Sequence, residues 1–263
     1  MLADAGVALE AKPFAVGVRL EMPQERIDYA RWGGPVPELG HASFRLTRRP
    51  ENGAEACYTF CMCPGGLVIA CASAPGMITT NGMSLSRRDL PLGNAAFLVP
   101  VSVERFSHDG DNALSGIDFQ QHLERDAFTA GGGDYSLPAQ RLVDFMNGDE
   151  SGELPELRSC ERARAVQLRG LLPDFVEHTL LQAVPAMLKN MRGVDLDEMV
   201  VYGVETRSSA PVRVLRGDNG ASLNARGLYP CGEGSGYAGG IVSSGIDGLR
   251  VAGQLCSRDK VYE

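Results

Sequence analysis

The sequence lacks a hydrophobic run long enough to cross a membrane, since no apolar stretch approaches the roughly 18 residues that a transmembrane helix needs. It also lacks an excess of positive charge, because the formal net charge is −8 at pH 7. An acidic protein is poorly suited to bind nucleic acid or anionic lipid. We therefore expect neither nucleic acid nor a membrane as a partner.

Signatures of several enzyme classes are absent as well. The sequence contains no G-x-S-x-G motif and no Walker-type phosphate loop, and its four histidines do not fall at zinc-ligand spacing. Its seven cysteines are an odd number in a chain of 263 residues, which is too large to need disulfides. We expect free thiols in a reducing, cytoplasmic protein. The length allows one large domain or two small ones.

Hydrophobic periodicity predicts strands in both halves of the chain and helices between them. The expected strands cover residues 14–21, 42–48, 57–62, 67–72, 97–103, 199–206 and 212–215. The expected helices cover residues 115–127, 138–146 and 174–191, and Gly148 is expected to end the second of them. Pro185 is expected to kink or break the last helix, and residues 2–12 read as the tail of a helix or hairpin.

Turn signals organise the strand-rich region. Pro64 and Gly65 are expected to join the strands of residues 57–62 and 67–72 into a hairpin. Asn81-Gly82 is a second turn signal, and Pro100 favours an edge strand or a bulge. These features predict an antiparallel sheet.

The most distinctive stretch is GLYPCGEGSGYAGGI, residues 227–241. A short apolar strand is expected at the start of this run, before its glycine-rich turn, and a helix with small or apolar residues at positions 241, 245, 248, 249 and 252 is expected after the turn. Gly234, Gly236 and Gly239 have the spacing of the dinucleotide fingerprint. A Rossmann unit continues into a second parallel strand, for which the sequence leaves no room.

The start of that helix is a candidate ligand site. The first turn of a helix presents about four unpaired amide donors and partial positive charge, which suit a phosphate or an electron-rich ring edge. Gly239 and Gly240 allow a flat ligand to approach the main chain, and Glu233 can accept hydrogen bonds from sugar-type hydroxyls. The alternative is a glycine-rich loop with an ordinary exposed glutamate.

Two further groups of residues have chemical potential. Cys57, Cys61, Cys63 and Cys71 lie close together and share strand parity, so a metal site is an alternative, although their spacing is weak for zinc or iron–sulfur. Buried apolar cysteine is the simpler interpretation of Cys57 and Cys71. In residues 205–213, two arginines and three hydroxyls surround a proline bend and can hold an anion. A solvated surface loop is the alternative that composition favours.

Five segments together resemble one protein family. They read KPFAVGVR (12–19), FCMCPGG (60–66), TNGMS (80–84), ETRSSAPVR (205–213) and LYPCGEG followed by GYAGGI (228–241). They are similar to the uncharacterised bacterial FAD-dependent dehydrogenases, also called NAD(FAD)-utilising dehydrogenases, which are related to the glutathione-reductase-like flavoproteins. Met22 departs from that pattern, because the family usually has a histidine there.

The resemblance implies roles for individual residues. Glu233 would meet the ribityl chain of FAD, and the helix start after it would face the flavin edge. The implied cofactor-binding residues are Gly232, Glu233, Gly234, Gly239, Gly240 and Ile241. The implied catalytic residues are Cys61, Cys63 and Arg207, because a thiolate beside a flavin can form an adduct or pass electrons. Asn81 and Arg213 are implied for substrate or phosphate, and no metal ligands are implied.

The resemblance also implies the architecture, an α/β protein that is α+β in this fragment. Residues 1–22 would return from an FAD domain, and residues 23–196 would form a substrate domain with a mixed or antiparallel sheet. Residues 197–263 would supply the closing strand and helix of the FAD-binding domain, whose first βαβ unit is absent.

The implied function is FAD-dependent oxidoreductase (dehydrogenase) activity on a small molecule, with NAD(P)H as a candidate electron partner. A missing amino-terminal FAD-binding segment would hold the adenosine and pyrophosphate. We therefore expect this chain alone to bind FAD weakly or not at all. A non-catalytic binding module and a cysteine-based metal-site protein remain as alternatives.

Overall fold

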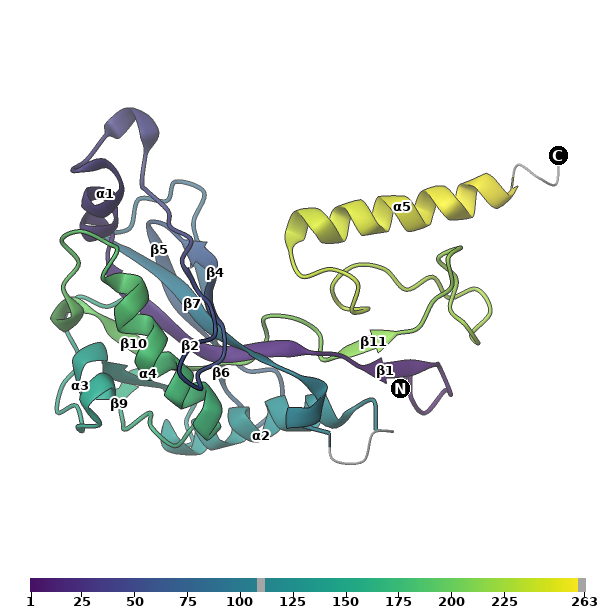
Figure 1. Cartoon of the computed structure of the whole chain (residues 1–263), viewed down its shortest axis with the longest axis horizontal. Coiled ribbons are helices and arrows are strands. Elements are labelled where there is room, and N and C mark those ends of the chain that lie inside the picture. The colour runs from purple at the N-terminus through teal and green to yellow at the C-terminus, as the bar shows by residue number, and fades with distance from the viewer. Residues whose placement is uncertain (108–111, 260–263) are drawn as a thin grey trace. The chain divides into compact units, whose positions relative to one another are not determined.

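The computed structural model describes residues 1–107 and 112–259, which form two compact units. The large unit comprises Ala15–Pro100 and Gln121–Thr206. The small unit comprises the described residues of Met1–Phe14, Val101–Gln120 and Arg207–Glu263. Each unit is therefore assembled from segments that lie far apart in the sequence (Figure 1).

The large unit is built on a mixed sheet of seven strands. These strands are β2 (Phe14–Pro23), β3 (Thr47–Arg48), β4 (Cys57–Cys63), β7 (Leu92–Val101), β8 (Leu137–Arg141), β9 (Ala163–Ala165) and β10 (Val200–Glu205). Their order is β3-β4-β7-β2-β10-β8-β9. β8 and β9 are parallel, whereas β3–β4, β4–β7, β2–β10 and β8–β10 are antiparallel. The prediction of a mixed α/β structure is confirmed.

β2 lies at the centre of this sheet, and every one of its ten residues is buried. A strand covered on both faces needs apolar side chains on both, and the run FAVGVRLEMP is apolar apart from two positions. Those positions, Arg19 and Glu21, share one parity and so face the same side of the strand. Both therefore require polar partners inside the unit.

A separate two-stranded sheet pairs β5 (Gly66–Cys71) with β6 (Thr79–Ser84) and packs against β4 and β10. Two predictions were wrong here. The turn at Pro64 and Gly65 does not make a hairpin of β4 with β5, because β4 pairs with β3 and β7 and the chain leaves that sheet at the turn. Asn81-Gly82 is not a turn but the middle of β6.

The helices are α1 (Gln24–Trp32), α2 (Ser115–Ala130), α3 (Leu142–Asn147), α4 (Asp174–Leu188) and α5 (Ile241–Asp259). Short 3-10 turns η1 (Pro37–Leu39), η2 (Val103–Arg105) and η3 (Leu196–Glu198) connect other elements. α3 ends at Gly148 in the left-handed conformation, as expected, but its start was misplaced, because Pro138 lies in β8. α4 runs through Pro185, which stands in its last turn, instead of breaking there.

In the small unit, β1 (Leu9–Ala11) pairs antiparallel with β11 (Val212–Val214). The aromatic rings of Phe14, Phe106 and Phe119 pack together with centroids 5.1 to 6.2 Å apart. The strand expected in residues 227–231 was wrong, since this segment is irregular, whereas the helix after the glycine run is present as α5. None of the described helices is long and apolar enough to span a membrane.

Close backbone approach at the sheet centre explains one glycine and generates a stability prediction. A Cβ on Gly17 of β2 would collide with the backbone oxygen of Phe97 in β7. We predict that Gly17→Ala lowers the free energy of unfolding by about 1–3 kcal/mol, as overpacking does. In Gly152→Ala, by contrast, the added Cβ meets no atom within 4 Å. Urea denaturation of both variants should separate them, and equal stability would refute the packing argument.

Candidate functional site

The two cysteines of the FCMCPGG segment sit on a bulge in β4. β4 pairs with β7 from Tyr58 to Phe60, after which the register shifts so that Cys63 lies opposite Asn94. Cys61 occupies the bulge with a positive φ of 44°, a conformation that L-residues other than asparagine and aspartate seldom adopt. The bulge breaks the strand's alternation, so that Cys61 is exposed while Cys63 is buried.

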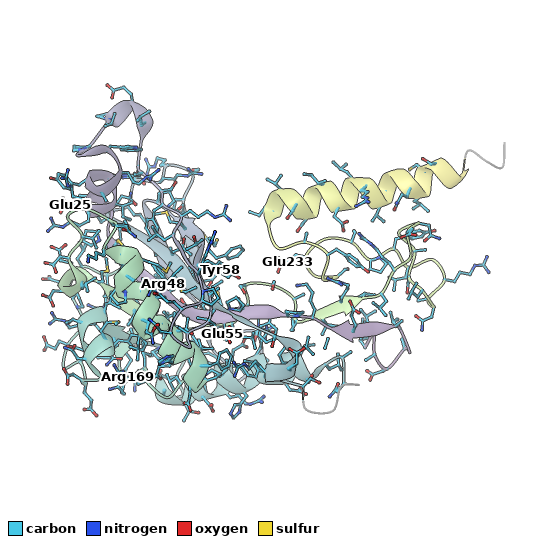
Figure 2. The ribbon with its side chains drawn as sticks, in the orientation of Figure 1. Glu25, Arg48, Glu55, Tyr58, Arg169 and Glu233 are labelled. Carbon is cyan, nitrogen blue, oxygen red and sulfur yellow. The ribbon has the colours of Figure 1, made fainter. Side chains whose placement is uncertain are left out.

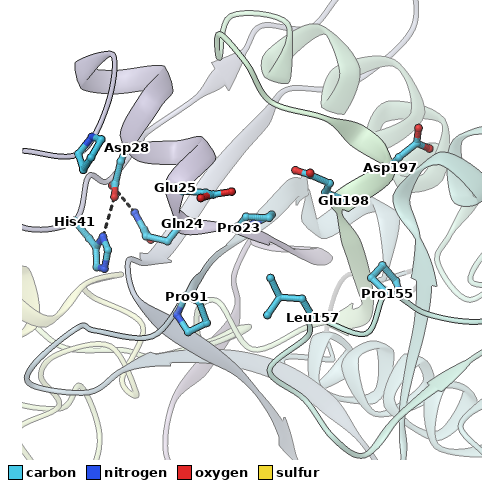
Figure 3. A pocket seen from close by; sticks show the side chains of 11 residues that line it. Pro23, Gln24, Glu25, Asp28, His41, Pro91, Pro155, Leu157, Asp197 and Glu198 are labelled. Carbon is cyan, nitrogen blue, oxygen red and sulfur yellow. Dashed lines mark hydrogen bonds and ion pairs between the residues drawn. The ribbon is translucent and has the colours of Figure 1, made fainter.

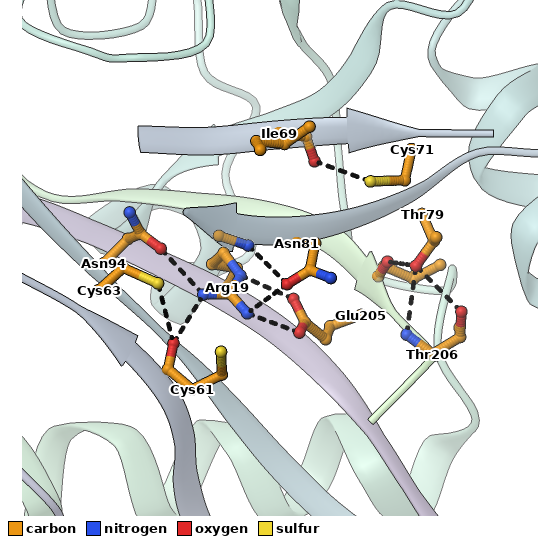
Figure 4. Close-up of polar contacts among 12 residues, drawn as sticks. Arg19, Cys61, Cys63, Ile69, Cys71, Thr79, Asn81, Asn94, Glu205 and Thr206 are labelled. Carbon is orange, nitrogen blue, oxygen red and sulfur yellow. Dashed lines mark hydrogen bonds and ion pairs between the residues drawn. The ribbon is translucent and has the colours of Figure 1, made fainter. Parts of the chain in front are cut away.

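The Arg19 side chain lies against this bulge and is fully buried (Figure 4). Its Nε and Nη2 donate to the two carboxylate oxygens of Glu205 at 2.8 and 2.7 Å. Its Nη1 donates to Asn94 Oδ1 at 2.9 Å and to the Cys61 carbonyl at 3.2 Å. The bidentate pair satisfies both buried charges, and the remaining donors hold the bulge in place.

Cys61 and Cys63 are coupled to each other and to this cation. The Cys63 thiol hydrogen-bonds Cys61, and together with the Arg19 charge it lowers the pKa of Cys61 to about 6, against the opposing effect of burial. The same hydrogen bond, together with burial, raises the pKa of Cys63. These opposite shifts favour the thiolate at Cys61 and the neutral thiol at Cys63. This is the asymmetry that distinguishes a reactive cysteine from a structural one.

β6 closes the site on one side. Asn81 Oδ1 accepts from Arg19 Nη2 at 3.5 Å and from the Gly82 amide at 2.7 Å. A Cβ on Gly82 would collide with Arg19 Nη1 and Asn94 Oδ1, so only glycine permits this close approach. Asn81-Gly82 was predicted to form a turn, but its glycine is needed for another reason, because this dipeptide packs over the Arg19 guanidinium.

A second polar chain continues from the same strands. Thr79 Oγ1 donates to the Val204 carbonyl at 2.8 Å and lies 3.0 Å from Thr206 Oγ1. Thr206 and Ser73 donate to the two oxygens of Glu124, each at 2.6 Å. These hydrogen bonds hold the end of β10 and the following residue, Thr206, in place. Sequence reasoning missed Arg19, Glu205, Asn94 and Glu124, although a charged residue inside an apolar strand run was a visible signal for the first two.

The structure brings together only some of the predicted site residues. Cys61, Cys63 and Asn81 meet around Arg19 in the large unit. The other predicted residues belong to the small unit: Arg207, Arg213, Gly232, Glu233, Gly234, Gly239, Gly240 and Ile241. Arg213 is bonded within that unit, to Glu10 at 2.8 Å and to the Gly236 carbonyl at 3.3 Å, and Arg207 is exposed.

The glycine loop before α5 is open. Glu233 is exposed (Figure 2), and a Cβ on Gly234 or Gly239 would meet no atom within 4 Å. At the helix start, Ser243 Oγ accepts from the Gly240 amide at 3.2 Å, and Ile241 is 95% exposed. The Gly232 amide donates to Asp247 Oδ2 at 2.9 Å, which anchors the loop to α5. The helix start is therefore not covered by larger side chains.

Another cavity of the large unit, of about 740 Å³, has walls of proline and leucine with carboxylates at its rim (Figure 3). Asp28 accepts from the Ala42 amide and pairs with His41, and Glu198 pairs with Arg26. These pairs occupy the carboxylates of Asp28 and Glu198, and none of the lining residues belongs to the cysteine site. Among the described residues, no cluster of three or more histidine, cysteine or acidic side chains suits a metal ion.

The buried pair of Arg19 and Glu205 leads to a prediction. Arg19→Met leaves Glu205 buried without its cation, and we expect the free energy of unfolding to fall by about 3–5 kcal/mol. The double variant Arg19→Met/Glu205→Leu should recover part of the loss, because no uncompensated charge remains. Arg26→Met, which breaks a half-exposed pair, should have a much smaller effect. Urea denaturation measures all three, and a double variant less stable than Arg19→Met alone would contradict this account.

Comparison with known proteins identifies the family of this chain. Residues 13–208 match the family described as FAD-dependent protein, C-terminal domain-like. An uncharacterized protein of Clostridium beijerinckii is 42% identical over 262 residues, which are 98% of this chain and 49% of the relative. The chain thus spans about half the length of that relative. The matched residues include Arg19, both site cysteines and Glu205, and the chain belongs to the family of FAD-dependent proteins represented by this C-terminal domain.

Proposed function

We propose that this chain is the substrate-side portion of an FAD-dependent oxidoreductase and that Cys61 and Cys63 act on the substrate. The observation that carries the proposal is an exposed cysteine on a strand bulge, whose carbonyl is bonded to a buried guanidinium and to a second cysteine, inside the segment that matches the FAD-dependent family. Residues 23–196 would form the substrate domain, with residues 1–22 and 197–263 belonging to the cofactor side.

The glycine loop fits one end of FAD. Its backbone offers open glycines that a flat ring can approach, and Glu233 is exposed and able to accept hydrogen bonds from ribityl hydroxyls. The amide end of α5 would favour an electron-rich ring edge at Gly240 and Ile241. When bound, FAD supplies a hydride or electron-pair acceptor. The residues of the glycine loop would hold one end of the cofactor. Arg207 is proposed as a catalytic residue, and Asn81 in the large unit and Arg213 in the small unit are each proposed to contact substrate or phosphate.

An additional segment is proposed to complete the cofactor site. α5 attaches to the small unit through a face on which Val251 is buried, Asp247 pairs with Arg216 at 2.6 Å and Gln254 donates to the Asp218 carbonyl at 2.8 Å. Its apolar face points outward, with Ile246 61% and Leu249 77% exposed. An outward apolar stripe of this kind marks an interaction surface. The half of the relative that this chain does not match is the proposed occupant.

Reconstitution tests the cofactor assignment. Purified alone, the chain should carry no stoichiometric flavin absorbance, because the adenosine and pyrophosphate contacts are proposed to lie elsewhere. Co-expressed with the unmatched half of the Clostridium beijerinckii relative, it should yield a complex with about one flavin per chain. Stoichiometric flavin in the chain alone contradicts the two-part site. A flavin-free complex contradicts the flavin assignment itself.

The outward face of α5 is tested in the same complex. Leu249→Asp places a charge on the proposed interface and should abolish co-purification without changing the circular dichroism of the chain, since the side chain is exposed. Leu223→Asp is the matched control, because Leu223 is also exposed, at 61%, but lies outside the helix. Equal co-purification of the two variants would rule out α5 as the docking helix.

A further inference from the structure

We propose that Cys61 and Cys63 are a redox-active dithiol that reduces disulfides by thiol–disulfide exchange, with Cys61 as the attacking thiolate and Cys63 as the resolving thiol. The proposal gives the two cysteines separate roles and names a substrate class, a disulfide carrying an apolar or aromatic group with an anionic substituent. The exchange needs no flavin, so it stands or falls separately from the cofactor assignment.

The first support is the geometry of the bulge. The extra residue in β4 turns the Cys61 carbonyl toward Cys63, whose Sγ donates to it at 3.4 Å, so the two cysteines are in direct contact. Cys61 is exposed and Cys63 is buried. An incoming disulfide can therefore reach only Cys61, while Cys63 is positioned to attack whatever forms there.

The second support is the electrostatic coupling of the pair. The groups that face it are Arg19 from β2, Glu205 from β10 and Ser84 from β6. The hydrogen bond with Cys61 and the negative charge of its thiolate help to raise the pKa of Cys63, whereas Arg19 and Ser84 lower it. When the Cys61 thiolate becomes a mixed disulfide, its negative charge disappears and Arg19 remains. The Cys63 pKa must then fall, so that the second thiol is activated only after the first has reacted.

The reaction balances without another reagent. The Cys61 thiolate attacks one sulfur of the substrate disulfide, forming a mixed disulfide and releasing one substrate thiolate. Cys63 loses its proton to solvent and attacks Cys61 Sγ, which releases the second substrate thiolate and leaves a Cys61–Cys63 disulfide. The electron pair passes from the dithiol to the substrate. The ring closed by a C-x-C disulfide is strained, and strained disulfides are easily reduced again.

The third support is a cavity that opens at Cys61. It measures about 450 Å³ and is lined by Phe44, Arg45, Tyr58, Phe60 and Met62 together with Cys61. The aromatic and thioether side chains suit an apolar or aromatic body, and the exposed Arg45 suits an anionic group. The cavity lies wholly within the large unit, so its shape does not depend on any other segment.

Titration with one equivalent of 5,5′-dithiobis(2-nitrobenzoate), an aromatic dicarboxylate disulfide, tests the proposal. The full chain should carry Cys231→Ser and Cys256→Ser, because these two cysteines are also exposed. We expect two equivalents of released thionitrobenzoate and no label retained on the protein. Adding Cys63→Ser should stop the reaction after one equivalent with the label retained. Adding Cys61→Ser should remove the fast phase.

The pH dependence of the first step supplies an independent readout. As the pH is lowered, the fraction of Cys61 that is present as thiolate should fall, with a midpoint near pH 6. At pH 6 the larger thiolate fraction outweighs the lower nucleophilicity, and Cys61 should react about 10-fold faster than an unperturbed thiol. Cys63→Ala removes the hydrogen-bond donor and should move the midpoint upward, whereas Cys63→Ser, which retains a donor, should largely restore it.

Three results would overturn the inference: a fast phase that survives Cys61→Ser, a label retained by the chain that has both cysteines, or identical pH midpoints for Cys63→Ala and the parent. Circular dichroism and urea denaturation verify that each variant is folded. Because no flavin is present in the assay, a positive result stands even if the reconstituted complex proves flavin-free.

Discussion

One buried cation organises the large unit, the guanidinium of Arg19 at the centre of β2. Its N–H groups reach Glu205 in β10, Asn94 in β7, Asn81 in β6 and the Cys61 carbonyl in β4. Because a buried charge without partners destabilises a fold by several kcal/mol, each of these strands must be in place for the others to be stable. The guanidinium that pairs with Glu205 in the interior therefore also fixes the bulge that carries the exposed Cys61 thiol.

The role of the buried Arg19 charge follows from a comparison of two cysteines in β4. Apolar side chains of similar volume often replace a buried ion pair without loss of stability, so stability alone does not require Arg19. Cys57 begins β4 in apolar surroundings, where burial raises its pKa to about 12. On the same strand, the pKa of Cys61 is about 6, because Cys63 and Arg19 stabilise its thiolate. The surroundings of the two cysteines therefore shift their pKa values in opposite directions.

The sequence predicted those features of the fold that depend on interactions between residues close together in the chain. The long strands β2, β4 and β10 were recognised from apolar runs, and Gly148 was correctly placed at a helix end because its left-handed conformation is a property of one residue. Asn81-Gly82 was misread because glycine serves there for close approach and not for a turn. Arg19 and Glu205 are 186 positions apart, so their pairing depends on tertiary structure that periodicity does not contain. Motif resemblance found the two cysteines but not the cation that activates one of them.

α5 illustrates the same limit in another form. Its sequence pattern gave an apolar face, and such a face normally packs inward. Here Ile246 and Leu249 point outward, whereas Asp247 and Arg216 join the opposite face to the small unit. The side chains of this ion pair are only 11 to 12% exposed, and Val251, one turn after Asp247, is buried. The exposed apolar stripe is the physical reason for our proposal that a further segment covers this helix.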